Sequence, residues 1–187
     1  MFLRSLACTL LLASSSLALP VLGCAQMGEM MKPAADKPLL SPAATAKVTV
    51  GSAAIGVTYN SPSMRGRVIM GKLVPYGHVW RTGANPATTI TTSTDLMFGN
   101  LLVPAGTHTL YTYPSETQWL LIINKQTGQW GTEYTQSMDL GRTPMKGSAL
   151  PALQENMTIT FEHTSGATTQ LHIKWEKTDE SVAVQAE

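Results

Sequence analysis

The feature that most constrains this fold is an alternation of apolar and polar residues with a period of two, which recurs from Lys47 towards the C-terminus. A period of two places alternate side chains on one face, as in a strand with one buried face. An amphipathic helix would instead repeat its apolar residues every three to four positions. The alternation therefore predicts a mainly β domain, with one buried face formed by Val48, Val50, Ile55, Val57, Tyr59, Met157, Ile159, Phe161, Leu171, Ile173 and Trp175.

Turn-forming residues separate these segments. Gly99-Asn100 lies between two short apolar runs, which is typical of a two-residue hairpin, and Thr164-Ser165-Gly166 marks a C-terminal hairpin. Residues 119–123 form a continuous apolar run, as expected for a strand covered on both faces. Only residues 147–153 suggest a short helical turn. Roughly eight to ten strands are expected, which predicts an all-β fold, an antiparallel β-sandwich or jelly-roll-like single domain.

The first 23 residues have the form of an export signal. Residues 6–19 are apolar or small, and Pro20 ends this run before it is long enough for a typical membrane span. The sequence VLGC at residues 21–24 resembles a bacterial lipobox, in which Cys24 is acylated and becomes the first mature residue. Ordinary cleavage after Ala25 is the alternative. We expect a protein of the periplasm or outer envelope that meets the membrane only through a lipid anchor at Cys24.

The mature chain is expected to have two parts, a Met/Ala/Pro-rich tether over residues 24–46 and a β-sandwich domain over residues 47–187. The chain has two cysteines; Cys8 belongs to the signal and Cys24 to its cleavage site, so no disulfide or Cys-ligated metal is expected in the domain. A net charge of +1 and only 13% charged residues argue against a nucleic-acid binder, which needs a basic surplus.

The most distinctive strings are YNSPSMRGR at residues 59–67 and LVPYGHVWRTGAN at residues 73–85. They are followed by ATTI at 87–90, PAGT at 104–107 and QWG at 129–131. Together these strings closely resemble the bacterial domain of unknown function 2911 family, over about residues 47–175. The resemblance implies an exported, mainly β domain without an established biochemical activity.

Three arginines fall in or beside the irregular segments within these strings, and a guanidinium group binds carboxylate, phosphate or sulfate through paired hydrogen bonds. Nearby aromatic rings would offer flat surfaces for a sugar, and asparagines would add neutral hydrogen bonds. The sequence therefore predicts a non-enzymatic site for a small anionic or glycan ligand, formed by Arg65, Arg67, Trp80, Arg81, Asn85, Asn124, Trp130 and Tyr134.

Two alternative interpretations use the same residues. In the first, Arg81 forms a structural ion pair with Glu133, Glu162 or Glu176 and the tryptophans belong to the core, so the domain is a structural or partner-docking sandwich. In the second, the pocket belongs to a hydrolase or lyase that uses Glu133 or a histidine as base, with Glu133 and Asp139 as a candidate carboxylate pair.

No catalytic residue, metal or cofactor is assigned from the sequence. It contains no nucleophile elbow, no His-Glu-x-x-His motif and no nucleotide fingerprint. The four histidines, at positions 78, 108, 163 and 172, lack metal-ligand spacing. His163 and His172 flank the C-terminal hairpin and would face each other only in a suitable register. The ligand, the partner and the oligomeric state are not encoded in any motif.

Overall fold

The structure is a computed structural model that describes residues 40–187. The expected export signal, the lipidation site at Cys24 and the expected tether up to residue 39 lie outside the described residues. Within the described part, ten strands are accompanied by one 3-10 turn, η1 (Gln136–Met138). No helix in residues 40–187 has the length and apolar character needed to cross a membrane.

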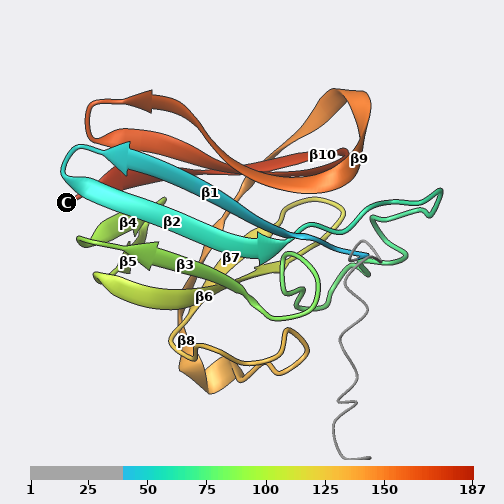
Figure 1. The fold of residues 1–187 in the computed structure, drawn as a ribbon, viewed down its shortest axis with the longest axis horizontal. Coiled ribbons are helices and arrows are strands. Elements are labelled where there is room, and N and C mark those ends of the chain that lie inside the picture. Colours follow the sequence, from blue (N-terminus) through green and yellow to red (C-terminus); the bar gives the residue numbers. More distant parts are fainter. Residues whose placement is uncertain (1–39) are drawn as a thin grey trace, which may run out of the picture. The chain divides into compact units, whose positions relative to one another are not determined.

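The strands form two antiparallel sheets that pack against each other (Figure 1). The six-stranded sheet has the order β1-β2-β3-β6-β7-β8, and the four-stranded sheet has the order β5-β4-β10-β9. The all-β sandwich expected from the sequence is therefore confirmed. The strands are β1 (Ala43–Val50), β2 (Ala53–Asn60), β3 (Thr88–Thr92), β4 (Leu96–Phe98), β5 (Leu101–Val103), β6 (Gly106–Tyr113), β7 (Leu120–Asn124), β8 (Asp139–Pro144), β9 (Lys146–Ser165) and β10 (Thr168–Ala186).

The alternation seen in the sequence forms the interface between the sheets. Ile55 and Val57 of β2 are buried against a core that also contains Leu171, Ile173 and Trp175 of β10. β7 is covered on both faces, as its continuous apolar run predicts: its odd-numbered residues join the main core, and Ile122 joins a second small cluster with Tyr111. Burial of these apolar side chains is the main favourable contribution to the fold.

Two details differ from the sequence-based expectations. Residues 147–153 are not helical; they belong to β9, where Ser148 pairs with Asp179 and Ala149 with Thr178 of β10. Hydrogen bonding to β10 keeps this segment extended, although its composition favours a turn. In addition, β1 begins at Ala43, inside the segment assigned to the tether, and pairs with β2 along its whole length. The hairpin at Gly99-Asn100 is present between β4 and β5, with Gly99 at a left-handed φ of 59°.

β9 and β10 form one long hairpin that folds back on itself (Figure 1). His172 and Asp179 lie seven residues apart in β10, yet their side chains are 2.8 Å apart. A straight strand would separate them by about 23 Å. The corner lies at Glu176, which has a φ of 58° and register shifts on both sides. The backbone amides of Ile69 and Met70 donate to the Glu176 carboxylate, each at 3.2 Å, and hold the corner against the neighbouring loop.

Candidate functional site

A cavity of about 320 Å³ lies beside the long connection between β2 and β3, residues 61–87, which supplies most of its lining. Five of the eight residues predicted for ligand binding line it, and Trp175 of β10 lies at its inner side. The rest of the described lining is apolar or small, apart from Ser41. The five predicted residues brought together here are Arg65, Arg67, Trp80, Arg81 and Asn85.

Trp80 fixes one wall of this cavity. Its backbone exchanges two hydrogen bonds with Thr112, at 2.8 and 2.9 Å, beyond the point where β3 stops pairing with β6. Its ring stacks on Trp175, with centroids 5.9 Å apart and planes at 18°, and meets Trp119 edge to face at 6.2 Å. Trp80 is therefore both a partly buried residue packed against the core and a lining residue of the cavity.

Arg81 follows Trp80 and projects into the same cavity wall without an acidic partner in residues 40–187. Its Nε is buried and has no hydrogen-bond partner there. Burial lowers the pKa of its guanidinium, because desolvation disfavours the charged form.

The structural ion pairs considered for Arg81 are not formed. Glu162 pairs with Lys174, and Glu176 accepts hydrogen bonds at the corner of the hairpin. Glu133 is exposed and forms no ion pair in the described part of the chain.

Arg65 and Arg67 are exposed and are oriented by backbone oxygens rather than by carboxylates. The Arg65 guanidinium donates to Leu40 O at 2.7 Å. Arg67 donates through Nε to Met64 O at 2.9 Å and through a terminal nitrogen to Ser63 O at 2.7 Å. These bonds fix the arginine side chains without neutralising their charge, and the one carboxylate bonded to this segment, Glu155 Oε1, accepts from the Arg65 backbone amide at 2.8 Å.

The β2–β3 connection beside the cavity contains three non-glycine residues with left-handed backbone. Arg65, Thr82 and Asn85 have φ values of 51°, 53° and 60°. This conformation costs about 1 kcal/mol or more, and a β-branched residue such as Thr82 adopts it rarely. Thr82 is fully buried and is held by Thr112 Oγ1 at 3.0 Å and by Thr88 Oγ1, which donates to its carbonyl at 2.8 Å. Strain held in place by such contacts is often found at functional sites.

Gly131 supports Arg81, and the sequence analysis did not identify this role. A Cβ at position 131 would lie 2.0 Å from Arg81 Cδ and 2.6 Å from Asn85 O. The Gly131 amide also donates to Asn85 O at 3.1 Å. The only signal in the sequence was the string QWG, which contributes to the family resemblance but gives no indication of the arginine above it.

The other three predicted ligand-binding residues lie away from this cavity. Asn124 is fully buried and donates to Asp139 Oδ1 at 2.8 Å and to Thr135 O at 3.0 Å. Tyr134 donates to Asp139 Oδ2 at 2.6 Å, and burial together with this bond raises the pKa of Tyr134 to about 12. Asp139 also pairs with Arg142 at 3.1 Å.

Trp130, the third of these residues, is 51% exposed and pairs through its backbone with Pro86.

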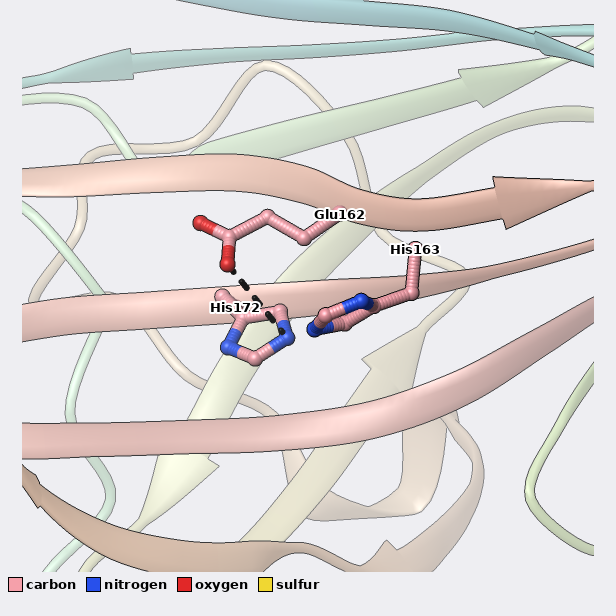
Figure 2. Close-up of side chains that lie close together, drawn as sticks. All are labelled: Glu162, His163 and His172. Carbon is pink, nitrogen blue, oxygen red and sulfur yellow. Dashed lines mark ion pairs between the residues drawn. The ribbon is translucent and has the colours of Figure 1, made fainter.

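A second polar cluster lies in the folded β9–β10 hairpin. Figure 2 shows Glu162, His163 and His172 with their side chains turned towards one another. One potential ligand atom from each lies within 4.8 Å of the others, and the two imidazole centroids are 6.1 Å apart. β9 and β10 therefore pair in a register that brings the side chains of His163 and His172 together. The Lys174 ammonium binds Glu162 and lowers the pKa of that carboxyl, which keeps it ionised.

The sequence from residue 41 to residue 184 matches the model of a family described as protein of unknown function (DUF2911). The chain therefore belongs to this family, and the resemblance found in its sequence is confirmed. No curated protein and no solved structure matches the chain.

Proposed function

We propose that this DUF2911 protein is a lipid-anchored envelope protein that binds a small anionic ligand, such as an acidic sugar or a phosphate compound, through Arg65, Arg67 and Arg81. The observation that carries the proposal is the state of Arg81. Its Nε is buried without a partner, and no acidic side chain in residues 40–187 forms an ion pair with its guanidinium. A carboxylate or phosphate of a ligand at the accessible part of this guanidinium would supply the counter-charge that residues 40–187 do not provide.

The neighbouring residues suit a ligand with a planar or ring-shaped part. Trp80 and Trp175 stack and both line the cavity; Trp175 is 1% exposed, so Trp80 supplies most of the apolar surface next to the guanidinium groups. Asn85 adds an amide on the same side. The cavity volume of about 320 Å³ is at the lower end of the range for small-molecule sites. This combination favours a compact ligand of about one ring with one anionic group.

Binding rather than hydrolysis or elimination is the activity that this lining favours. Within residues 40–187, the cavity is lined by arginine, asparagine, serine and apolar or small residues, with no Asp, Glu or His among them. Glu133 and Asp139, considered above as bases, do not line the cavity, and Asp139 is occupied by Asn124, Tyr134 and Arg142. A general base must reach the proton that it removes, directly or through one water.

The envelope location rests on the N-terminal sequence. Residues 1–23 have the order of an export signal, and the lipobox-like string ends at Cys24. The proposal therefore puts the cavity outside the cytoplasm, where it would meet envelope glycans and small metabolites.

Calorimetric titration with galacturonate and with inorganic phosphate tests the proposal, with glucose as the uncharged comparison. We expect saturable binding of at least one anion and none of glucose. Arg81→Met should weaken that binding about 10–100-fold, the effect of losing a charge-assisted hydrogen-bond pair. The same change should alter the free energy of unfolding by less than about 1 kcal/mol, because it strands no carboxylate.

Lys125→Ala is the matched control, since it removes one positive charge from an exposed position that does not line the cavity. Its affinity should equal that of the wild type. Absence of saturable binding for both anions would contradict the proposal. A stability loss of about 3–5 kcal/mol in Arg81→Met would instead indicate a structural ion pair and favour the partner-docking interpretation.

A further inference from the structure

We propose that Glu162, His163 and His172 form a binding site for a divalent transition-metal ion of the zinc type, on the face of β10 opposite the core. Leu171, Ile173 and Trp175 occupy the core face of the same strand. This inference does not depend on the arginine cavity. It rests on an irregularity in β9, on the orientation of His172 and on the charges around Glu162.

The irregularity brings two consecutive residues to the same side. Neighbouring residues of a regular strand point to opposite faces, so Glu162 and His163 would normally diverge. Between the pairs Ser165↔Thr168 and Glu162↔Gln170, β9 has one residue more than β10, which is a β-bulge. His163 lies in this bulge with a φ of 53°. The bulge turns the His163 ring towards His172, as Figure 2 shows. Bulges commonly redirect a side chain next to a functional site.

His172 is oriented as a metal-ligating histidine usually is. Its Nδ1 lies 2.8 Å from Asp179 Oδ1, and the residue is only 7% exposed. A hydrogen bond from Nδ1–H to a carboxylate fixes the ring and the tautomer, and it leaves the lone pair on Nε2. Nε2 lies 3.2 Å from Gln170 Oε1 and 4.0 Å from Glu162 Oε2, so a metal ion bound at Nε2 would replace the Gln170 contact. Carboxylate–histidine pairs of this kind are the usual outer support of zinc ligands.

Glu162 has one carboxylate oxygen free to act as a ligand. Lys174 binds Oε1, whereas Oε2 points towards His172. Glu162 and Asp179 supply two negative charges, and Lys174 also lies 3.8 Å from Asp179. One ammonium therefore balances only part of the local negative charge, which favours the approach of a cation.

The donor set indicates the class of metal. Two imidazole nitrogens and one carboxylate oxygen suit Zn²⁺ and its first-row neighbours, whereas Mg²⁺ and Ca²⁺ require mostly oxygen ligands. Tetrahedral bonds of about 2.0–2.1 Å place ligand atoms about 3.4 Å apart, and the present atoms lie within 4.8 Å. His163 is exposed and Glu162 is only partly buried, so rotation of these two side chains can close the difference around the fixed His172.

Calorimetric titration of the purified protein with ZnCl₂ tests the site. The chain carries no histidine tag and has the changes Cys8→Ser and Cys24→Ser, so that thiols do not bind the metal. We expect one equivalent of Zn²⁺ to bind, with no comparable signal from MgCl₂. His163→Asn and Glu162→Gln should each weaken Zn²⁺ binding about tenfold or more. Asparagine is chosen at position 163 because it tolerates the left-handed φ found there.

His78→Ala is the matched control, because it removes an exposed histidine from a loop outside the cluster. Its Zn²⁺ affinity should not change. Zn²⁺ should also shift the ring NMR signals of His163 and His172 but not those of His78. The proposal is overturned by absence of saturable Zn²⁺ binding in the folded protein, by equal affinity in both ligand variants and the wild type, or by equal binding of Mg²⁺.

Discussion

Glu180 is a buried acid whose surroundings oppose its charge. It is 6% exposed, and its Oε2 has no hydrogen-bond partner within residues 40–187. Desolvation, with a smaller effect of the neighbouring Asp179, raises the pKa of Glu180 to about 7. The folded protein therefore holds a proton on this carboxyl at mildly acidic pH, where the unfolded chain has already released it.

The pH dependence of stability follows from this difference. Between the unfolded pKa, near 4.5, and the folded pKa, near 7, the native state binds more protons, so the free energy of unfolding falls as pH rises. Below this window both states are protonated, and above it the cost is constant. Glu180→Gln removes the titration and should make the protein more stable than the wild type at pH 8, by an amount on the order of 2 kcal/mol after allowance for solvent screening.

Urea unfolding of both proteins at pH 4.5, 6 and 8 measures the effect as a difference, in which contributions from the other groups cancel. The advantage of Glu180→Gln should grow from pH 4.5 to pH 8. A constant difference across these pH values would show that Glu180 titrates normally in the folded protein.

At the residue scale, the sequence was most informative for the arginines. Their number is small, they fall in two irregular segments, and the chemistry of a guanidinium group is the same in any fold. Asn124 and Tyr134 were assigned to the site on residue type alone. Both are taken up by Asp139, which lies in β8 beside the loop that carries Tyr134. No local pattern marks such a contact, because it depends on which strands become neighbours.

At the scale of elements, the loop before β3 and the loop between β7 and β8 touch at Gly131. Gly131→Ala places a methyl group 2.0 Å from the present position of Arg81 Cδ and 2.6 Å from Asn85 O. We expect the variant to lose about 1–3 kcal/mol of stability through overpacking, because a backbone oxygen cannot move aside as a flexible side chain can. Chemical denaturation measures this change, and anion binding in the same variant should fall as Arg81 is displaced.

Gly56→Ala provides the control for Gly131→Ala. Gly56 lies in β2, without a left-handed φ, and a methyl group added there would meet nothing within 4 Å. Its replacement should leave stability unchanged or slightly higher. If both variants behave alike, the close approach of Gly131 to Arg81 has no energetic consequence.

The β9–β10 hairpin shows what a period-two pattern leaves open. The pattern correctly predicted the two strands and their inward face, but it did not predict the bulge at His163 or the corner at Glu176. Both positions have left-handed φ values on residues other than glycine, so the usual glycine signal is missing. The corner is stabilised by a contact from elsewhere in the chain, in which the amides of Ile69 and Met70 donate to the Glu176 carboxylate.

At the scale of the whole molecule, one core joins the two sheets. Leu121 of β7 and Trp175 of β10 belong to the same buried cluster, although they lie in different sheets. We therefore expect a single cooperative unfolding transition, with the same midpoint by far-ultraviolet circular dichroism and by tryptophan fluorescence. Leu121→Ala should lower the free energy of unfolding by about 2–5 kcal/mol and shift both signals together.

The exposed Leu153 provides the comparison for this test. It is 58% exposed, so Leu153→Ala should change stability by less than about 1 kcal/mol. Separate midpoints for the two signals in the Leu121→Ala variant would show that the sheets unfold independently.

The sequence by itself determined the fold class, most of the strands and the family, because alternation, turn residues and distinctive strings are local properties of the chain. It also identified the arginines of the candidate cavity. The tertiary structure alone decided that Arg81 lacks an acidic partner in residues 40–187, that Gly131 makes room for it, and that Glu162, His163 and His172 meet. Each of these depends on which distant segments pack together and in what register, and that choice is made by the burial of the whole core.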